Sequence, residues 1–349
     1  MPYQLVHNGV VREFEFYPPV GWHYWHERVF TEDGRNGLPL IIALHGGAQS
    51  PSGFALDWPF PLVSNPADET NWEDRFFVLY PYGHAYSHLA GEPVRGWNTG
   101  FADDFLPAQS DVSFIRAAVD AVEEMLRRKL GELGVTRPPI DADRRFVFGY
   151  SMGGMMAYKL AHEIGDHLAA LWVMAGAIGG RSHEGLTGTI TNDPTGRSAV
   201  SLFAHHGELD IVVPPGPRQD TSGRVQSTFV PDLYAVTGMP AAEIPRRKTS
   251  LRHLAAAIEI FKVHNDCELT AYFNPLGTDG STTSADDVAG AATSVKFVFR
   301  RIGNPANPEV VVYRDPTMEH GNFTSAGANR YFDAGDVWNF FKAHPRVQA

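Results

Sequence analysis

Cysteine is almost absent from this chain: Cys267 is the only one in 349 residues. A lone cysteine cannot form an intramolecular disulfide, and no Cys/His spacing matches a structural zinc site, so we expect no bound metal. The fold must therefore rest on its apolar core. The hydrophobic fraction of 43% and the charged fraction of 20% are typical of a globular chain and exclude global disorder.

Long apolar runs are also missing. No segment approaches the 18 apolar residues that a membrane-spanning helix needs, and residues 1–20 lack the basic start, apolar stretch and cleavage site of a signal peptide. The sequence as it stands predicts a soluble, cytoplasmic protein. A secreted chain from which a leader had been removed would look the same.

The chain has no excess of positive charge. Its formal net charge of −11 at pH 7 would repel the phosphates of nucleic acids and anionic lipid headgroups. We therefore expect neither nucleic acid nor a membrane surface as a partner. The composition leaves the oligomeric state open.

Short β-prone segments run through the chain. Residues 3–6 and 10–16 flank Asn8-Gly9, a dipeptide that favours the tight turn of a β-hairpin because both positions tolerate positive φ. Continuous apolar runs bounded by turn residues are typical of strands buried on both faces of a parallel sheet. These runs are Pro39 to Leu44, Phe76 to Tyr80, Phe146 to Gly149, Leu168 to Met174, Val200 to Ala204 and Val310 to Tyr313.

Helical patterns alternate with these strands. Asp111 can cap a helix whose apolar residues recur at helical spacing as far as Gly134, and Asp333 can cap a helix near the C-terminus. Residues 152–164 and 251–263 also show helical spacing. The alternation predicts a doubly wound, mostly parallel α/β sheet that opens with the N-terminal antiparallel hairpin.

Three stretches rich in Gly, Pro, Ser, Thr or Asp fit no regular element: residues 179–198, 214–249 and 274–293. We expect them to be surface insertions on a single domain that spans residues 1–349. The insertion 214–249 is a candidate lid or pocket wall.

A sharp turn is expected where the strand at Phe146 ends. Gly149-Tyr150-Ser151-Met152-Gly153 lies between that strand and the helix 152–164. This is the G-x-S-x-G pattern of a nucleophile elbow, in which a strained turn exposes a serine Oγ and leaves no room for side chains at the glycine positions. The strand, turn and helix together predict the α/β-hydrolase fold with Ser151 as the nucleophile.

A glycine turn, His45-Gly46-Gly47, follows an earlier predicted strand. In this fold such a turn supplies one backbone N–H to the oxyanion hole, and the residue after the nucleophile, Met152, supplies the other. Two preorganised amides would stabilise the oxyanion of a tetrahedral intermediate. We predict Gly47 as the donor in the turn, with Ala48 as the alternative. His45 and His206 are expected to be structural, hydrogen-bonded residues.

The fold also requires an acid and then a histidine after the nucleophile. Asp210, at the end of the strand 200–204, is the predicted acid, with Glu208 and Asp193 as alternatives. His320 is the predicted base, because it lies between the last predicted strand and the C-terminal helix. The other histidines after Asp210 lie on or after predicted helices: His253, His264 and His344.

These segments together resemble the esterase family that includes polyhydroxybutyrate depolymerases, feruloyl esterases and acetylxylan esterases. The likeness runs from about Pro39 to Arg346 and includes further blocks at Val78 to Gly83, Gly96 to Asn98, Asp111 to Ile115 and Asp333 to His344. The resemblance implies hydrolysis of carboxylic esters through a serine acyl-enzyme, without a cofactor. It also makes Trp97, Asn98 and Tyr150 candidates for substrate contact, with a core aromatic as the alternative for Trp97.

The chain departs from that family in one informative way. Secreted depolymerases of the group usually carry paired cysteines near the oxyanion turn and the Trp-Asn motif, where this chain has Gly47 and Gly96. The departure argues against a polymer and favours a small-molecule or oligomeric ester as substrate. A peptidase, an amidase or a C–C bond hydrolase would use the same triad and stays an alternative, as does a non-catalytic ligand-binding relative.

Overall fold

The computed structural model describes residues 2–19, 37–64, 73–89, 92–99, 111–179, 199–210, 212–213, 215, 218–219, 225–226, 251–252, 254–273, 295–301, 308–315, 318–320 and 332–346. Most of the three predicted insertions, including most of the candidate lid at 214–249, lies outside the described residues.

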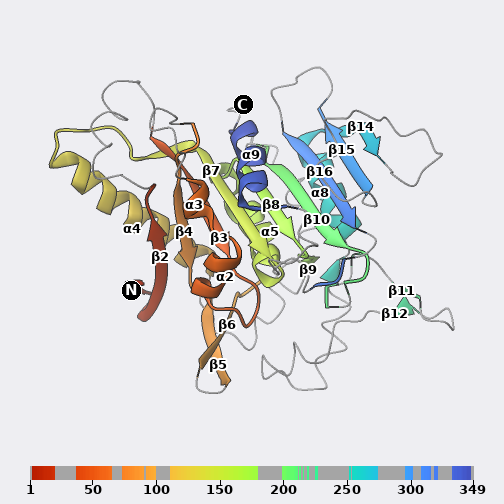
Figure 1. The fold of residues 1–349 in the computed structure, drawn as a ribbon, viewed down its shortest axis with the longest axis horizontal. Helices are drawn as coiled ribbons and strands as arrows, with labels where there is room; N and C mark the ends of the chain where they lie inside the picture. Colours follow the sequence, from red (N-terminus) through yellow and green to blue (C-terminus); the bar gives the residue numbers. More distant parts are fainter. Residues whose placement is uncertain are drawn as a thin grey trace.

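A ten-stranded sheet forms the centre of the fold, in the order β1-β2-β4-β3-β7-β8-β10-β16-β15-β14 (Figure 1). Its strands are β1 Tyr3–His7, β2 Val10–Tyr17, β3 Leu38–Leu44, β4 Phe77–Pro81, β7 Ile140–Tyr150, β8 Ala170–Met174, β10 Ser201–Gly207, β14 Glu268–Phe273, β15 Val295–Arg300 and β16 Glu309–Asp315. The strands from β4 to β16 in this order pair in parallel, and those outside them pair antiparallel. The predicted mostly parallel α/β sheet is confirmed.

The sequence predicted one edge of the sheet and missed the other. The predicted hairpin is confirmed: β1 and β2 pair around Asn8 and Gly9, which have φ angles of 50° and 79°. At the other edge, β14 and β15 were not predicted. Glu268, Leu269 and Thr270 are exposed, and an amphipathic edge strand does not form the continuous apolar run that marks a central parallel strand.

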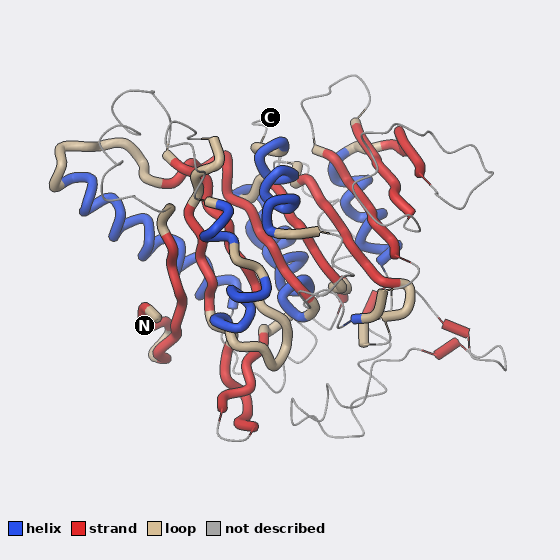
Figure 2. Tube along the Cα trace, in the orientation of Figure 1, coloured by secondary structure: helices blue, strands red, loops and turns tan. Residues whose placement is uncertain are grey.

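Helices cover both faces of the sheet (Figures 1 and 2). Strand β3 shows the division: Leu40, Ile42 and Leu44 join one hydrophobic cluster, and Ile41 and Ala43 join the other. This alternation follows from the period of two in a strand. The first cluster includes α4 Asp111–Gly131, α5 Met152–Ile164 and α8 Leu254–Asn265, and the second includes α2 Pro51–Asp57, α3 Phe60–Val63 and α9 Ala334–Ala343.

Several shorter elements lie outside the ten-stranded sheet and its main helices. The turn η1 Gly165–His167 follows α5. Short antiparallel pairs among the described residues also lie outside the main sheet: β5 His84–Leu89 with β6 Glu92–Gly96, β9 Ile178–Gly179 with β13 Leu251–Arg252, and β11 Arg218–Gln219 with β12 Val225–Gln226.

The predicted helix ends are confirmed in one case and corrected in another. Asp333 caps α9 in a capping box with Asp336. The helix predicted to begin at Leu251 is wrong at its start, because Leu251 and Arg252 pair with β9 and α8 begins at Leu254. The backbone bonds of that short pair replace the first helical turn.

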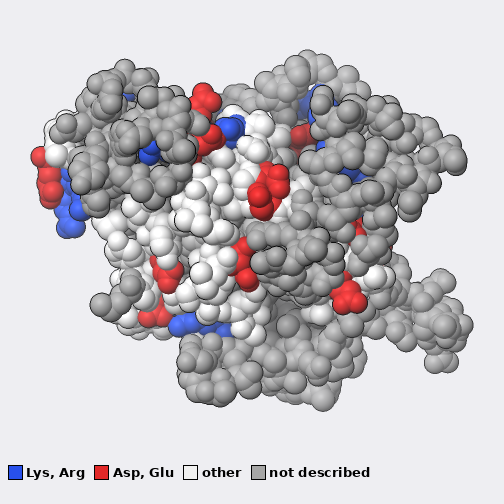
Figure 3. Space-filling model, in the orientation of Figure 1, with Lys and Arg blue, Asp and Glu red and all other residues white. Residues whose placement is uncertain are grey.

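On the face shown in Figure 3, acidic residues lie scattered among uncharged ones. Within the part of the chain that the structure describes, no helix is long and apolar enough to cross a membrane.

Candidate functional site

Ser151 lies at the sharp turn between β7 and α5. Its backbone has φ 54° and ψ −119°, a region that non-glycine residues rarely occupy. The turn is held by a hydrogen bond from the Ser151 amide to the Met174 carbonyl on β8, at 2.8 Å. Such strain persists only where the surrounding structure enforces it, and it is common at active sites.

The glycines of the elbow are required by close backbone approach. A Cβ atom on Gly149 would overlap the carbonyl oxygen of Gly153. A Cβ atom on Gly153 would overlap the carbonyl oxygen of Leu44, at the end of β3. Neither glycine position has room for a side chain, as the sequence pattern predicted, and the elbow packs directly against the start of the His45-Gly46-Gly47 turn.

The structure brings Ser151, His320 and Asp210 into one hydrogen-bonded chain. The Ser151 Oγ lies 2.8 Å from His320 Nε2, and His320 Nδ1 lies 2.7 Å from Asp210 Oδ2. The serine is 5% exposed and the aspartate is fully buried. With the proton on Nδ1, the histidine donates to the carboxylate, and its Nε2 is free to accept the serine proton.

The Asp210 carboxylate is fixed at both oxygens. Its Oδ1 accepts the backbone amides of Val212 and Val213 at 2.9 and 2.8 Å, while Oδ2 faces His320. Burial alone would raise the pKa of this carboxyl, but its interactions with His206 and His320 outweigh burial and lower it to about 2. Asp210 is therefore ionised throughout the neutral range.

The alternative candidates either have another partner or lie outside the described residues. Glu208 pairs instead with Arg314 on β16, and Asp193 lies outside the described residues. Among the other candidate histidines, His344 pairs with Glu309 at 2.9 Å, whereas His253 lies outside the described part of the chain. The geometry selects Asp210 and His320 as the partners of Ser151.

Two neighbouring side chains hold the acid and the base in place. His206 Nε2 donates to the Val213 carbonyl at 2.6 Å and lies 3.5 Å from Asp210 Oδ2, so it steadies the loop that carries the carboxylate. Tyr150 donates its hydroxyl to the His320 carbonyl at 2.7 Å, and it is only 5% exposed. Tyr150 was predicted to contact substrate, but the structure places its hydroxyl on the backbone of the base.

The His45-Gly46-Gly47 turn lies beside the elbow. The Gly46 amide donates to Gln49 Oε1 at 2.7 Å, and the Ala48 amide donates to the Arg95 carbonyl at 2.8 Å. The Ala48 amide is therefore engaged within the protein. Met152 is the first residue of α5. Backbone amides in the first turn of a helix have no intrahelical acceptor, and the positive end of the helix dipole lies there.

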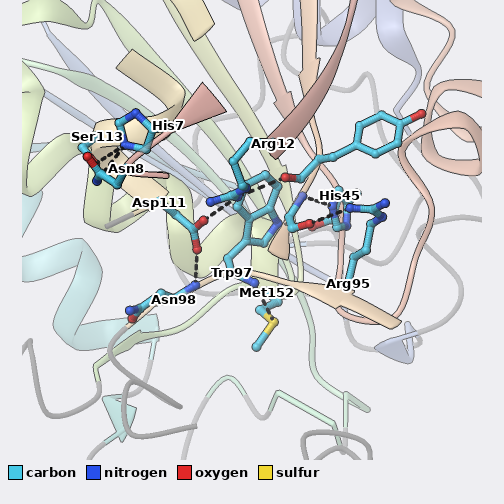
Figure 4. Close-up of polar contacts among 12 residues, drawn as sticks. His7, Asn8, Arg12, His45, Arg95, Trp97, Asn98, Asp111, Ser113 and Met152 are labelled. Carbon is cyan, nitrogen blue, oxygen red and sulfur yellow. Dashed lines mark hydrogen bonds and ion pairs between the residues drawn. The ribbon is translucent and has the colours of Figure 1, made fainter. Parts of the chain in front are cut away.

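Trp97 lies behind this turn and is fully buried (Figure 4). Its indole Nε1 donates to the His45 carbonyl at 2.8 Å, and its ring packs 4.9 Å from the His45 ring. This burial matches the core-aromatic alternative. Asn98 is 9% exposed, its amide bonds to Asp111 and its carbonyl accepts Lys159. Substrate contact by these two residues stays a prediction.

His45 is a structural residue, as expected. Its Nε2 accepts the Gly83 amide at 3.0 Å and its Nδ1 bonds to the Gly46 carbonyl at 2.7 Å. Burial lowers its pKa to about 4, so the ring is neutral at pH 7. A neutral ring is what this pair of contacts requires, because Nε2 must keep its lone pair.

Sequence reasoning missed the charged residues behind the turn. Arg12, Lys159 and Arg95 contact Asp111, the Asn98 carbonyl and Glu13, respectively. No short motif marks these contacts, because each joins segments far apart in the chain. Among the described residues, no group of three or more His, Cys, Asp or Glu side chains could hold a metal ion.

Comparison with known proteins gives related results. Residues 97–247 match a family model described as phospholipase/carboxylesterase. The mouse lysophospholipase-like protein 1 is 23% identical over 232 residues, which cover 66% of this chain and 89% of that protein.

Among solved structures, an acetyl xylan esterase from Aspergillus awamori superposes with a TM-score of 0.50 and 13% identity, covering 98% of this chain and 99% of its own. A thermostable esterase gives a TM-score of 0.35 at 20% identity, covering 68% of this chain and 52% of its own. The chain thus spans about half of that esterase. The full-length superposition shows a shared fold.

Proposed function

We propose that this chain, an α/β-hydrolase of the esterase type, cleaves carboxylic esters with Ser151 as its nucleophile. The observation that carries the proposal is the continuous hydrogen-bonded chain from Ser151 Oγ through His320 to the buried Asp210 carboxylate. Nucleophile, base and orienting acid within hydrogen-bond reach are the signature of an activated serine.

The reaction follows from these positions. His320 Nε2 accepts the Oγ proton as Ser151 attacks the ester carbonyl, and the imidazolium that forms is stabilised by ionised Asp210. His320 then returns the proton to the departing alcohol. In the second half, His320 takes a proton from water as the water attacks the acyl-enzyme. The bond between Ser151 Oγ and the acyl carbon then breaks, His320 gives the proton to Oγ, and the acid is released.

The oxyanion formed in both halves needs donors beside Ser151. We assign the amides of Gly47 and Met152 to this role. Engagement of the neighbouring Gly46 and Ala48 amides within the protein supports Gly47 over Ala48, and the free first turn of α5 supports Met152. Preorganised amides of this kind usually supply the largest single contribution to catalysis.

The test is Ser151→Ala with p-nitrophenyl acetate as substrate. We expect kcat/KM to fall by at least about 10⁴-fold, because the residual rate would come only from binding and the oxyanion hole. Ser113→Ala is the matched control: Ser113 Oγ also contacts a histidine, 2.8 Å from His7 Nε2, away from the elbow. Wild-type hydrolysis by Ser151→Ala would refute the proposal, and so would failure of a fluorophosphonate to label the wild-type enzyme.

The substrate class is tested separately. We propose a small or oligomeric ester, because the chain lacks the cysteine pairs typical of the secreted depolymerases it resembles. Rates on p-nitrophenyl acetate, methyl ferulate and suspended polyhydroxybutyrate would rank the ester types. A matched p-nitroanilide separates esterase from amidase chemistry, since the acyl group is the same and only the leaving group changes.

A further inference from the structure

A buried polar network links the N-terminal hairpin to the back of the oxyanion turn (Figure 4). Arg12 on β2 donates to Asp111 Oδ1 at 2.7 Å, and the two side chains are 3% and 2% exposed. The guanidinium also donates to the Tyr82 carbonyl at 3.1 Å and lies 3.9 Å above the Phe114 ring. Buried ion pairs contribute little net stability, because desolvation offsets their attraction, but they can fix one geometry.

The second oxygen of Asp111 binds the backbone at Asn98, so the buried ion pair also holds that segment in place. Asp111 Oδ2 accepts the Asn98 amide at 2.5 Å, and the Asn98 carbonyl accepts Lys159 Nζ at 2.9 Å. Lys159 lies on α5, the helix that begins after Ser151, and it is 7% exposed. One backbone residue is thus held by a buried carboxylate at its N–H and by a buried ammonium at its C=O, and such charge-assisted bonds are stronger than neutral ones.

Trp97, next to Asn98, connects this anchored segment to both sides of the oxyanion site. Its indole donates to the His45 carbonyl at 2.8 Å, and its amide faces Met152 Sδ at 3.5 Å. The same stretch holds the far side of the turn, since the Arg95 carbonyl accepts the Ala48 amide. The contacts flank Gly46 and Gly47.

A glycine pair is the most flexible backbone a turn can have, and it gains a fixed shape only from contacts outside itself. Oxyanion donors act by being oriented before the reaction begins. Resting on the proposed function, we propose that Trp97 and the buried Arg12–Asp111 pair are positioning residues of the oxyanion hole. They touch no reacting atom, and they fix where the Gly47 amide points.

The decisive variant is Trp97→Phe, which keeps a buried aromatic ring and removes the hydrogen bond to His45. Trp172→Phe is the matched control: Trp172 is 1% exposed on β8, and its Nε1 has no hydrogen-bond partner among the described residues. Active enzyme is counted by fluorophosphonate titration, so any loss of folded protein is corrected. Rates are measured with p-nitrophenyl acetate.

The readout specific to the oxyanion is the affinity for an alkyl trifluoromethyl ketone. Attack of Ser151 Oγ on its carbonyl forms a C–O bond, moves the Oγ proton to His320 and leaves a hemiketal oxyanion in the site. We expect Trp97→Phe to lower kcat about 10-fold and to raise the inhibition constant by a similar factor, with KM within about twofold, because one displaced donor weakens only oxyanion binding. Trp172→Phe should change none of these.

A second variant, Asp111→Asn, removes the charge at the other end of the network and should show the same pattern. Wild-type kcat and inhibitor affinity in Trp97→Phe would overturn the positioning role while leaving the proposed function intact. Equal losses in Trp172→Phe would also overturn it. A wild-type enzyme that the fluorophosphonate does not label would refute the proposed function itself, and the positioning role with it.

Discussion

Replacing Asp210 by asparagine tests the proposed triad at its most constrained residue. Asp210 Oδ1 accepts two backbone amides, from Val212 and Val213. An asparagine must keep its oxygen in that position, because its NH₂ group cannot accept those bonds. The NH₂ group therefore takes the place of Oδ2, 2.7 Å from His320 Nδ1. A donor there moves the imidazole proton to Nε2, which can then no longer accept the proton of Ser151.

We expect Asp210→Asn to lower kcat on p-nitrophenyl acetate by about 10⁴-fold, or about 5 kcal/mol of transition-state stabilisation, which is the scale known for a wrong tautomer in serine hydrolases. Glu208→Gln is the control, since Glu208 pairs with Arg314 on β16, whereas Asp210 bonds to the base. Its kcat should stay within about twofold of wild type. Melting temperatures of both variants and of the wild type show whether the variants are folded. A folded Asp210→Asn enzyme within 10-fold of wild type would refute the tautomer argument.

Two further predictions concern the base and the response to acid. Tyr150→Phe removes the hydrogen bond from the tyrosine hydroxyl to the His320 carbonyl. Because one hydrogen bond contributes about 1 kcal/mol, kcat should fall roughly fivefold at constant KM. The control is Tyr80→Phe, which removes a similar buried bond to the Trp58 carbonyl and should leave kcat unchanged. Burial lowers the pKa of His45 to about 4 and that of His205 to about 3, from the ordinary value of 6.5. Below pH 6.5 the unfolded chain therefore binds more protons than the folded one. The free energy of unfolding falls as the pH drops. Each of these two histidines should lower the free energy of unfolding by about 2 kcal/mol at pH 5 relative to pH 7.5. Urea unfolding at the two pH values measures this difference. His205→Leu should lose about 2 kcal/mol less over this range, and an unchanged pH dependence in that variant would contradict the assignment.

Much of the fold could be predicted because its signals are local. The central strands are continuous apolar runs, the hairpin turn is a dipeptide, and the elbow is a short pattern between a strand and a helix. The strands β14, at the edge of the sheet, and β15, next to it, lacked such a signal, since their described residues are mostly exposed or only partly buried. The start of α8 was misplaced because Leu251 pairs with β9, which is remote in sequence.

Within the candidate site, the sequence pointed to Ser151, His320 and a short choice of acids through the order in which this fold uses them. It favoured Asp210 but left Glu208 as an alternative, because the two carboxylates lie close together in the chain and differ in which partner the fold brings near. It also could not separate the Gly47 and Ala48 amides. The hydrogen bond from the Ala48 amide to the Arg95 carbonyl, on a different segment, is what favours Gly47 in our proposal.

The sequence by itself determined which residues can carry the chemistry and the order of strands and helices that presents them, because turn chemistry, burial period and capping act over a few residues. Only the tertiary structure decided what those residues touch. His320 is 110 residues from Asp210 and 169 from Ser151, and Trp97 meets His45 across 52. Contacts at such separations are set by how the sheet and its helices pack together, and no local pattern records them.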